Sequence, residues 1–343
     1  MLSRVSGLRG YAEIVEGLMR TKCVVEPVTD RAHWDELFSR VEQPHLPQSW
    51  AFGEAVEATV GRRPQRPQRL LDVGGWRARR IVFERNGEPV AICQLLEKSL
   101  AGLRVAALVD RGPLMLDADP SEEVVRDVYQ TLRRARRYFG GLLILVPPLP
   151  EGTATSRLLG ELGFRPRRVG GYRSTRVDLR PGEEGMLNNL RTNWRRNLKS
   201  GQRSRAVISQ SNAPKDMAWM VDRHIQNMRE RGFDFPAAAL VQALYDAAPD
   251  DFRIFRAAVD GEFIAGMCTY RFGQVGEYYV GWVSEAGRKT NVNNVLFWQA
   301  ALDLRSRGCH WLDLSGMRAG ATEPFKTGMG GTEYQFTRNW LAY

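Results

Sequence analysis

Hydrophobic positions along this chain follow two periods, which predict alternating strands and helices. Short apolar runs favour strands, and apolar residues at i, i+3, i+4 and i+7 favour helices. The run 141–146 is apolar throughout, as in a strand that is buried on both faces. Tyr278 and Trp282 fall on one face of an expected strand at 277–283, and we expect such aromatic side chains to pack in the core.

The expected elements form two similar sets. In the first half they are a strand at 23–28, helices at 31–41 and 48–59, strands at 80–85, 89–97 and 104–109, a helix at 121–138 and a strand at 141–146. In the second half they are helices at 182–204, 214–231 and 236–247, strands at 252–259, 262–272 and 277–283, a helix at 292–307 and a strand at 310–314. Both halves therefore have helices, then three strands suited to an antiparallel meander, then a helix and a strand.

The local sequences of the two halves also repeat. Residues 86–91 (NGEPVA) match residues 260–265 (DGEFIA), 174 positions later. A repeat of this length indicates two copies of one α/β domain and not a solenoid of short units. We therefore expect two tandem domains, at 22–180 and 181–343, each a mixed, mostly antiparallel sheet flanked by helices.

Residues 1–21 have apolar positions at helical spacing, which predict a short amphipathic helix. Docking of this helix on the protein itself, on a second subunit or on a membrane surface stays open, as does the oligomeric state. The first twenty residues lack the uninterrupted apolar region of a secretory signal. No apolar run in the chain approaches the ~18 residues that span a bilayer.

Composition narrows the class of protein further. The 343 residues include 49 Lys and Arg against 39 Asp and Glu, a net charge of +10. Proteins this basic commonly bind a polyanion such as nucleic acid, a phosphorylated cofactor or an anionic membrane. The four cysteines and four histidines are scattered and predict neither a disulfide framework nor a metal site. We therefore expect a location in the reducing cytoplasm.

Four motifs in one order along the chain carry a family resemblance. They are Gln48-Ser49-Trp50, Arg111-Gly112-Pro113, the basic segment 190–199 (LRTNWRRNLK), and Leu312–Gly316 followed by Phe325-Lys326. With the duplicated order of elements, they resemble the Fem family of non-ribosomal peptidyl transferases, in which each half has the GNAT acyltransferase fold. The resemblance implies transfer of an aminoacyl group from aminoacyl-tRNA, as co-substrate, to an amine or hydroxyl on a peptidoglycan precursor, another small molecule or a protein. It implies no further cofactor.

The segment that opens the second half is strongly basic. Seven basic residues and no acidic one lie between positions 185 and 215. Arg191, Arg195 and Lys199 would share one face of a helix at i, i+4 and i+8. Because such a face suits a phosphate backbone, we expect these three residues and Arg196 to bind the RNA of the donor.

A second candidate for donor binding precedes the helix at 292–307. A CoA-dependent GNAT enzyme has a glycine-rich loop there, whose backbone N–H groups hold the pyrophosphate. This chain has Arg288 and Lys289 but no glycine after Gly287 until the helix begins. Side chains obstruct close approach of the backbone, so CoA binding is disfavoured and the two cations are expected to hold a phosphate of another donor.

Lys326 and Asp313 are the main catalytic candidates. Lys326 is expected in a glycine-flanked turn, directly after Phe325. The resemblance implies that this pair holds the terminal adenosine of the donor, with Lys326 stabilising charge near the acyl ester. A fixed cation there would stabilise the oxyanion that forms when an amine attacks an ester. Asp313 ends a predicted strand and is either a general base for the amine or a cap of the Ser315-Gly316 turn.

The acceptor side is expected in the first half. Gln48, Trp50 and Arg111 belong to the family-like motifs, and Asp110 is a second candidate base beside Arg111. The family's lysine soon after the tryptophan, which is linked to binding a nucleotide-sugar peptide, has no match here. Acidic Glu54 lies in that stretch instead.

Two other functions fit the same sequence. One is an acyl-CoA-dependent N-acyltransferase that acts on a sugar or an amine in polysaccharide or cell-envelope synthesis. The other is a non-enzymatic protein that binds nucleic acid through the basic segment. Loss of activity on RNase treatment separates the two enzymes, and a Lys326→Ala variant separates an enzyme from a binding protein.

Overall fold

The computed structural model describes residues 23–59, 75–100, 103–139, 141–233, 236–317 and 322–343. The helix predicted for residues 1–21 lies outside these residues. The chain divides into two compact units. The first unit comprises Met1–Glu42, Arg63–Gly171 and Thr337–Tyr343, and the second comprises Gln43–Arg62 and Tyr172–Phe336. The predicted repeat boundary at 180/181 stays a prediction, because compactness alone does not show where a repeat ends.

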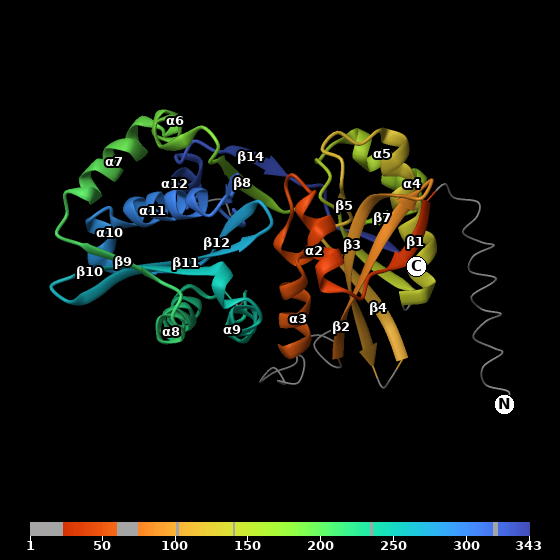
Figure 1. Cartoon of the computed structure of the whole chain (residues 1–343), viewed down its shortest axis with the longest axis horizontal. Coiled ribbons are helices and arrows are strands. Elements are labelled where there is room, and N and C mark those ends of the chain that lie inside the picture. Colours follow the sequence, from red (N-terminus) through yellow and green to blue (C-terminus); the bar gives the residue numbers. More distant parts are fainter. Residues whose placement is uncertain (1–22, 60–74, 101–102, 140, 234–235, 318–321) are drawn as a thin grey trace. The chain divides into compact units, whose positions relative to one another are not determined.

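The first unit is built on one mixed sheet (Figure 1). Its strands lie in the order β1 (Cys23–Pro27), β2 (Gly75–Arg85), β3 (Glu88–Leu100), β4 (Leu103–Asp110), β6 (Leu142–Val146), β15 (Trp340–Ala342) and β7 (Arg165–Pro166), with β5 (Leu114–Met115) paired to β3. Its helices are α2 (Arg31–Ser39), α4 (Glu122–Ala135), the 3-10 helix η3 (Arg136–Phe139) and α5 (Thr153–Glu161). Ser121 caps α4 by accepting a hydrogen bond from the backbone of Val124.

The second unit has a sheet of its own. Its strands lie in the order β14 (Thr332–Gln335), β8 (Arg173–Asp178), β13 (Trp311–Asp313), β12 (Val275–Val283), β11 (Glu262–Phe272), β10 (Phe252–Val259) and β9 (Val207–Ser211). Its helices are η1 (Leu46–Gln48), α3 (Trp50–Thr59), α6 (Gly182–Asn189), α7 (Thr192–Gln202), α8 (Pro214–Arg231), α9 (Ala238–Ala247), η4 (Pro249–Asp251), α10 (Glu285–Lys289), α11 (Val292–Ser306) and α12 (Glu323–Thr327). Figure 1 shows α7 and α11 on one side of this sheet and α8 and α9 on the other.

The two sheets have the same topology. Each has an antiparallel meander, β2-β3-β4 or β10-β11-β12, followed by a parallel neighbour, β6 or β13. The strand beside this parallel neighbour comes from the other half of the chain in each sheet. In the first sheet β15, near the C-terminus, pairs with β6, and in the second sheet β8 pairs with β13. The expected meanders are therefore confirmed, and the exchanged strands were not predicted.

The sequence repeat is also a repeat of backbone geometry. Asn86 and Gly87 join β2 to β3 with φ angles of 57° and 80°, and Asp260 and Gly261 join β10 to β11 with 51° and 85°. Positive φ at both central residues is typical of a type I′ hairpin turn, where glycine is favoured at the second position. Each hairpin also has a register shift at the same place, after Phe83 and after Ala257.

The expected helix at 182–204 is wrong in one respect. Leu190 has an extended backbone (φ −63°, ψ 135°), which separates α6 from α7. Arg191 is also extended and caps α7, so it does not share a helical face with Arg195 and Lys199. Four apolar residues of the segment, Met186, Leu190, Trp194 and Leu198, are all buried.

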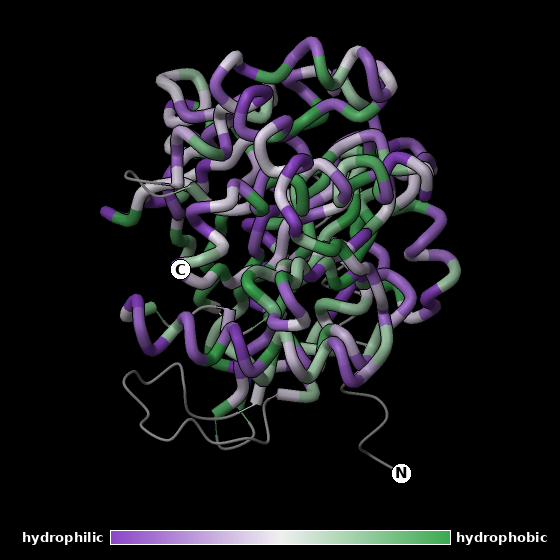
Figure 2. The backbone as a smooth tube through the Cα atoms, turned by 90° about the vertical axis from the view of Figure 1, so that its left-hand side faces the viewer, coloured by the Kyte–Doolittle hydropathy of each residue, from purple (hydrophilic) through white to green (hydrophobic). Residues whose placement is uncertain are grey.

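Each unit has its own hydrophobic core. Phe83, Tyr129 and Leu132 belong to the core of the first unit, and Phe255 and Trp298 to that of the second. Hydrophobic segments lie mainly inside the traced backbone, with hydrophilic segments around them (Figure 2). Among the described residues, no helix combines the length and the apolar character needed to cross a membrane.

Candidate active site

Strands β12 and β13 separate partway along the second sheet. Their pairing covers Val275–Glu277, after which β13 ends at Asp313 while β12 continues to Val283. A register shift against β11 leaves Tyr279 as an extra residue just beyond this point. Such bulges are common beside active sites, where they redirect side chains. In the first sheet, β6 is paired with β4 over its whole length, so the open strand edge is a feature of the second sheet.

A cavity of about 300 Å³ lies beside this open edge. Four aromatic residues and three cations make up half of its lining residues, and an apolar wall with a few polar groups is common in small-ligand sites. The residues that line it are Asn227, Arg231, Gly266, Met267, Tyr278, Gly281, Trp282, Val283, Arg288, Asn293, Phe297, Thr322, Phe325 and Lys326. Tyr278 and Trp282 were expected to serve mostly in core packing. The bulge at Tyr279 changes the strict alternation on which that expectation depended.

Lys326 contributes a nearly buried cation to this cavity. The residue is 7% exposed and lies in the short helix α12, not in the glycine-flanked turn that we expected. Its ammonium donates hydrogen bonds to the carbonyl oxygens of Gly316 at 2.9 Å and Ser315 at 3.3 Å. It also lies 5.5 Å from the centre of the Tyr278 ring. Its position is thus set by backbone oxygens on one side and an aromatic face on another.

Burial lowers the pKa of Lys326 from 10.5 to about 8, although the nearby carboxylates of Asp313 and Glu277 oppose the shift. Removing an ammonium group from water destabilises its charged form, which is the physical cause. At neutral pH roughly nine-tenths of such a group is still protonated. Lys326 can therefore act as a cation at pH 7 and loses its proton in the mildly alkaline range.

Asp313 holds the turn that receives Lys326. Its Oδ1 accepts the backbone N–H of Ser315 at 2.8 Å and lies 2.6 Å from the Ser174 hydroxyl. Its Oδ2 accepts the Tyr334 hydroxyl and two guanidinium N–H groups of Arg176, each at 3.3 Å. A buried carboxylate with this many donors is a structural anchor, because a proton-accepting role would require one of them to leave. Of the two roles expected for Asp313, the geometry matches the cap of the turn.

Glu277 was missed in the sequence analysis. It is a buried carboxylate at the last paired position of β12, and it accepts the Ser315 hydroxyl at 3.1 Å. The signal in the sequence was an acidic residue inside an otherwise uncharged strand. Its place at the point of strand separation makes it the candidate base, since the geometry gives Asp313 the role of an anchor.

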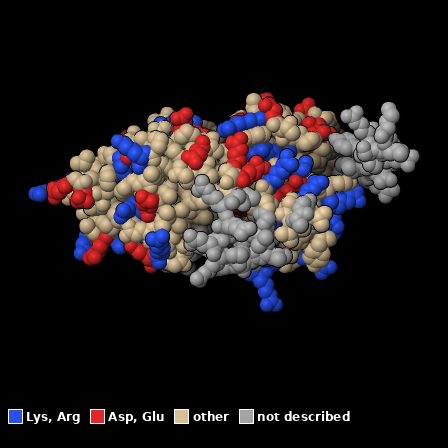
Figure 3. Space-filling model, turned by 90° about the horizontal axis from the view of Figure 1, so that it is seen from below, with Lys and Arg blue, Asp and Glu red and all other residues tan. Residues whose placement is uncertain are grey.

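The expected basic face divides into residues bound within the protein and residues that face solvent. The Arg191 guanidinium donates to the Thr327 hydroxyl at 3.3 Å, and Arg195 donates to the Asn188 carbonyl oxygen at 3.0 Å. Arg196 and Lys199 are exposed, and neither has a carboxylate partner within the described part of the chain. Figure 3 shows the molecule from the side of α8 and α9, where basic and acidic side chains are mixed.

A second cavity, of about 460 Å³, adjoins the first across Phe325, which lines both. Its other lining residues include Arg191, Trp194, Asn197 and Asn294. The indole N–H of Trp194 and the Nδ2 of Asn294 are buried there without a partner among the described residues. The two cavities therefore share the Phe325 ring, and the second one has two buried hydrogen-bond donors without a described partner.

The other two candidates for donor binding, Arg288 and Lys289, lie in different surroundings. Arg288 lines the Lys326 cavity. Lys289 instead forms a solvent-exposed ion pair with Glu285 at 2.8 Å. Gly287 is needed for packing, because a Cβ atom at this position would collide with the carbonyl oxygen of Ile264.

The acceptor candidates belong to two different units. Asp110 and Arg111 are in the first unit, 3.7 Å apart as an ion pair. The Asp110 side chain is 34% exposed, and partial burial raises its pKa while Arg111 opposes the rise. In the second unit Gln48 is fully buried, and the Trp50 indole donates to Glu54 at 2.8 Å. A role for these residues in acceptor binding stays a prediction.

Comparisons with known proteins agree with this topology. Residues 186–327 match a family model described as an acetyltransferase (GNAT) domain, so the second half carries a GNAT-type acyltransferase domain. The solved structure of FemX is similar with a TM-score of 0.73 and 14% identity, over 93% of this chain and 96% of that one. None of the curated protein sequences matches this chain.

Two further solved structures share the topology. A tandem GNAT protein from the clavulanic acid biosynthesis pathway, solved without AcCoA, has a TM-score of 0.52 and 13% identity over 93% of this chain and 98% of that one. L-PGS from Bacillus licheniformis has a TM-score of 0.50 and 13% identity over 92% of this chain and 91% of that one. At these identities the likeness concerns the fold, and it confirms the duplicated fold expected from the sequence.

Proposed function

We propose that this chain, which has a Fem-like duplicated GNAT fold, transfers an aminoacyl group from aminoacyl-tRNA to an amine or hydroxyl acceptor. The observation that carries the proposal is the Lys326 ammonium, held by the Gly316 carbonyl inside a cavity at the open edge of β12. A preorganised cation in a partly dehydrated cavity suits a reaction in which negative charge develops on an oxygen.

The reaction needs few groups from the protein. The acceptor nitrogen attacks the carbonyl carbon of the ester that joins the amino acid to the ribose, and the carbonyl oxygen becomes an oxyanion opposite Lys326. The bond from carbon to the ribose oxygen then breaks, and an amide remains. The nitrogen loses a proton to a base, for which Glu277 is the candidate, and the ribose oxygen leaves with a proton.

An RNA donor suits the surroundings of α11 better than CoA. Gly287 packs against Ile264 and does not form a glycine loop for pyrophosphate. The adjoining cavities share Phe325, and Arg288 and Arg191 each line one of them. An aromatic ring with flanking cations suits a terminal nucleotide, since bases stack on aromatic side chains and arginine binds phosphates. Exposed Arg196 and Lys199 would contact phosphates further along the RNA.

The test is an aminoacyl transfer assay with the full chain. A pool of aminoacyl-tRNAs with radiolabelled amino acids is incubated with amine acceptors, including a peptidoglycan precursor. We expect transfer that RNase abolishes. A Lys326→Met variant should reduce kcat by about 10²–10³. The matched control is Lys215→Met, an exposed lysine at the start of α8, which should keep the wild-type rate. Near-wild-type transfer by Lys326→Met would refute the proposal.

The second candidate is an acyl-CoA-dependent N-acyltransferase, which the match to an acetyltransferase domain favours. This activity would survive RNase and would require an acyl-CoA with a sugar or amine acceptor. Mass spectrometry of small RNA and nucleotides that copurify with the protein provides an independent comparison of the two donors.

A further inference from the structure

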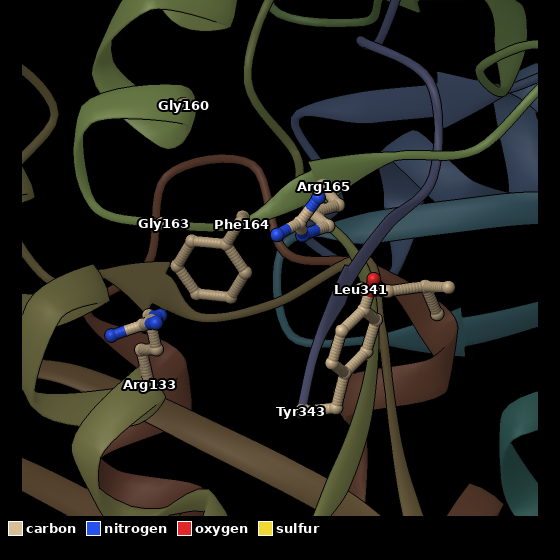
Figure 4. A pocket seen from close by; sticks show the side chains of 7 residues that line it. All are labelled: Arg133, Gly160, Gly163, Phe164, Arg165, Leu341 and Tyr343. Atoms are coloured by element: carbon tan, nitrogen blue, oxygen red, sulfur yellow. The ribbon is translucent and has the colours of Figure 1, made fainter.

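A cavity of about 400 Å³ in the first unit is formed by residues that the proposed transfer reaction does not use. Arg133 comes from α4, Phe164 follows α5, and Arg165 lies in β7. Gly160, Gly163, Leu341 and Tyr343 complete the lining. Figure 4 shows the Phe164 ring between the side chains of Arg133 and Arg165, with the Tyr343 ring directed toward Arg165.

The cavity carries positive charge from two arginine side chains. None of its lining side chains is acidic. Within the described part of the chain, neither Arg133 nor Arg165 has an ion-pair partner, and the Nε of Arg133 is buried without a hydrogen-bond acceptor. Burial and the neighbouring charges of Arg136 and Arg134 lower the pKa of Arg133. Burying part of a guanidinium without a partner is costly, and an anionic ligand would offset that cost.

Tyr343 adds a flat, accessible surface to this charged cavity. The residue is 65% exposed. Its main-chain oxygen accepts a hydrogen bond from Arg136 at 3.2 Å, and the Arg165 guanidinium lies 5.7 Å from the centre of its ring. A positioned aromatic ring beside a guanidinium is a stacking surface for another flat ring.

Gly163 helps to keep room for the Arg133 guanidinium. Its φ of +80° is a conformation that other residues rarely adopt, and a Cβ there would lie 2.8 Å from Nη2 of Arg133. A side chain at this position would therefore displace the guanidinium at the cavity wall. The arrangement keeps a cation next to open space.

We propose that this cavity binds a nucleoside phosphate, with the phosphate held by Arg133 and Arg165 and the base stacked on Tyr343. The guanidinium pair accounts for the phosphate, because arginine binds phosphate oxygens through two N–H groups at once. The exposed ring accounts for the base. A free nucleotide and a segment of single-stranded RNA both carry this chemistry, and the site is independent of the aminoacyl transfer proposed above.

Titration calorimetry of the full chain at low ionic strength tests the site, with 5′-AMP, adenosine and inorganic phosphate as probes. We expect saturable binding of 5′-AMP, with adenosine and phosphate each about tenfold weaker or more. Arg133→Gln and Arg165→Gln should each weaken 5′-AMP binding by about tenfold or more. The matched control is Arg157→Gln, an exposed arginine on α5 outside the cavity, which should bind as the wild type does.

Two further variants separate this site from a plain phosphate site and from the Lys326 cavity. Tyr343→Ala should weaken 5′-AMP binding and leave phosphate binding unchanged. The Lys326 cavity can also take up 5′-AMP as an analogue of the terminal nucleotide, so Lys326→Met should leave unchanged only the component of 5′-AMP binding that depends on Arg133 and Arg165. Without ligand, Arg133→Gln should be at least as stable to heat as the wild type, since it removes an unpartnered buried charge.

Competition with oligoadenylate distinguishes the two sources of the ligand. Displacement of 5′-AMP in the wild type, with loss of oligoadenylate binding in Arg133→Gln, would assign the site to an RNA chain. A lack of displacement would assign it to a free nucleotide. Three results would overturn the proposal: no saturable binding of 5′-AMP, binding that both arginine variants retain in full, or loss in Lys326→Met of the component that depends on Arg133 and Arg165. Equal affinity for phosphate and 5′-AMP would overturn the assignment to a nucleoside.

Discussion

The ammonium of Lys326 donates a hydrogen bond to the carbonyl oxygen of Gly316 at 2.9 Å. Gly316 follows Ser315, which has a positive φ of 61° and donates its backbone N–H to Asp313. The bond from Lys326 therefore connects the cation of the cavity to this turn. The position of the ammonium therefore depends on the turn as well as on its own helix. Substitutions that loosen the turn are expected to affect catalysis without touching the substrate.

Asp313→Asn tests this positioning role. The Arg176 guanidinium would lose its buried ionic partner, so we expect the free energy of unfolding to fall by about 3 kcal/mol or more. The Asp313 carboxylate raises the pKa of Lys326. Its neutralisation should thus move the alkaline limb of the pH–rate profile of transfer to lower pH. Urea unfolding and a pH series of transfer rates measure the two effects.

Ser174→Ala is expected to have a smaller effect than Asp313→Asn. It removes one hydrogen-bond donor from Asp313 and leaves the charge of the Asp313 carboxylate in place. This variant should lower the free energy of unfolding by about 1–3 kcal/mol and leave the alkaline limb of the pH–rate profile at the wild-type pH. If Asp313 is instead the general base, Asp313→Asn will lose activity over the whole pH range without moving that limb.

The pH dependence of transfer should report the titration of Lys326. Its pKa is about 8, so the cation that stabilises the oxyanion is lost above that pH. We expect kcat to fall about tenfold per pH unit beyond pH 8. A Lys326→Arg variant should have a lower rate without this alkaline limb, because the guanidinium stays charged but places its charge differently. Identical limbs in the two proteins would assign the titration to another group.

Lys326 should also make stability depend on pH. Its pKa in the folded state, about 8, is below the ordinary 10.5, so the folded protein binds fewer protons than the unfolded chain between these values. The wild type should therefore gain stability relative to Lys326→Met as the pH rises from 8 to 10.5, by roughly 3 kcal/mol in total. Urea unfolding of both proteins at pH 7 and pH 10 measures the difference. Parallel curves would mean that Lys326 is not buried as a cation.

The exposed cations of α7 should determine the salt dependence of RNA binding. Replacing both Arg196 and Lys199 with Gln should flatten the log–log salt slope by about 1 to 2 units, on the single-strand scale. Arg195→Gln should change the slope less, since that guanidinium is engaged with the Asn188 carbonyl. Filter binding of tRNA over a salt series measures the slopes, with Arg157→Gln as a charge-matched control. A larger effect from Arg195 than from Arg196 would contradict this division.

Much of the fold could be predicted from local pattern. The helix at 214–231 and the strands at 252–259 and 262–272 have the predicted bounds, because long periodic segments and asparagine-glycine or aspartate-glycine turns act locally. The short strands β8 and β15 were missed. Their residues are strands because a neighbouring strand supplies hydrogen bonds, and that neighbour is far away in the sequence.

The amino-acid sequence alone determined the duplication, the basic character of residues 185–215 and the adjacency of Phe325 and Lys326, since each can be read from short segments of sequence. The tertiary structure decided what those residues do. The separation of β12 from β13 forms the Lys326 cavity, and the partners of Asp313 come from positions as far apart as Ser174 and Tyr334. Burial and charge at such a site depend on segments that meet only on folding, so a buried cation cannot be recognised from its local sequence.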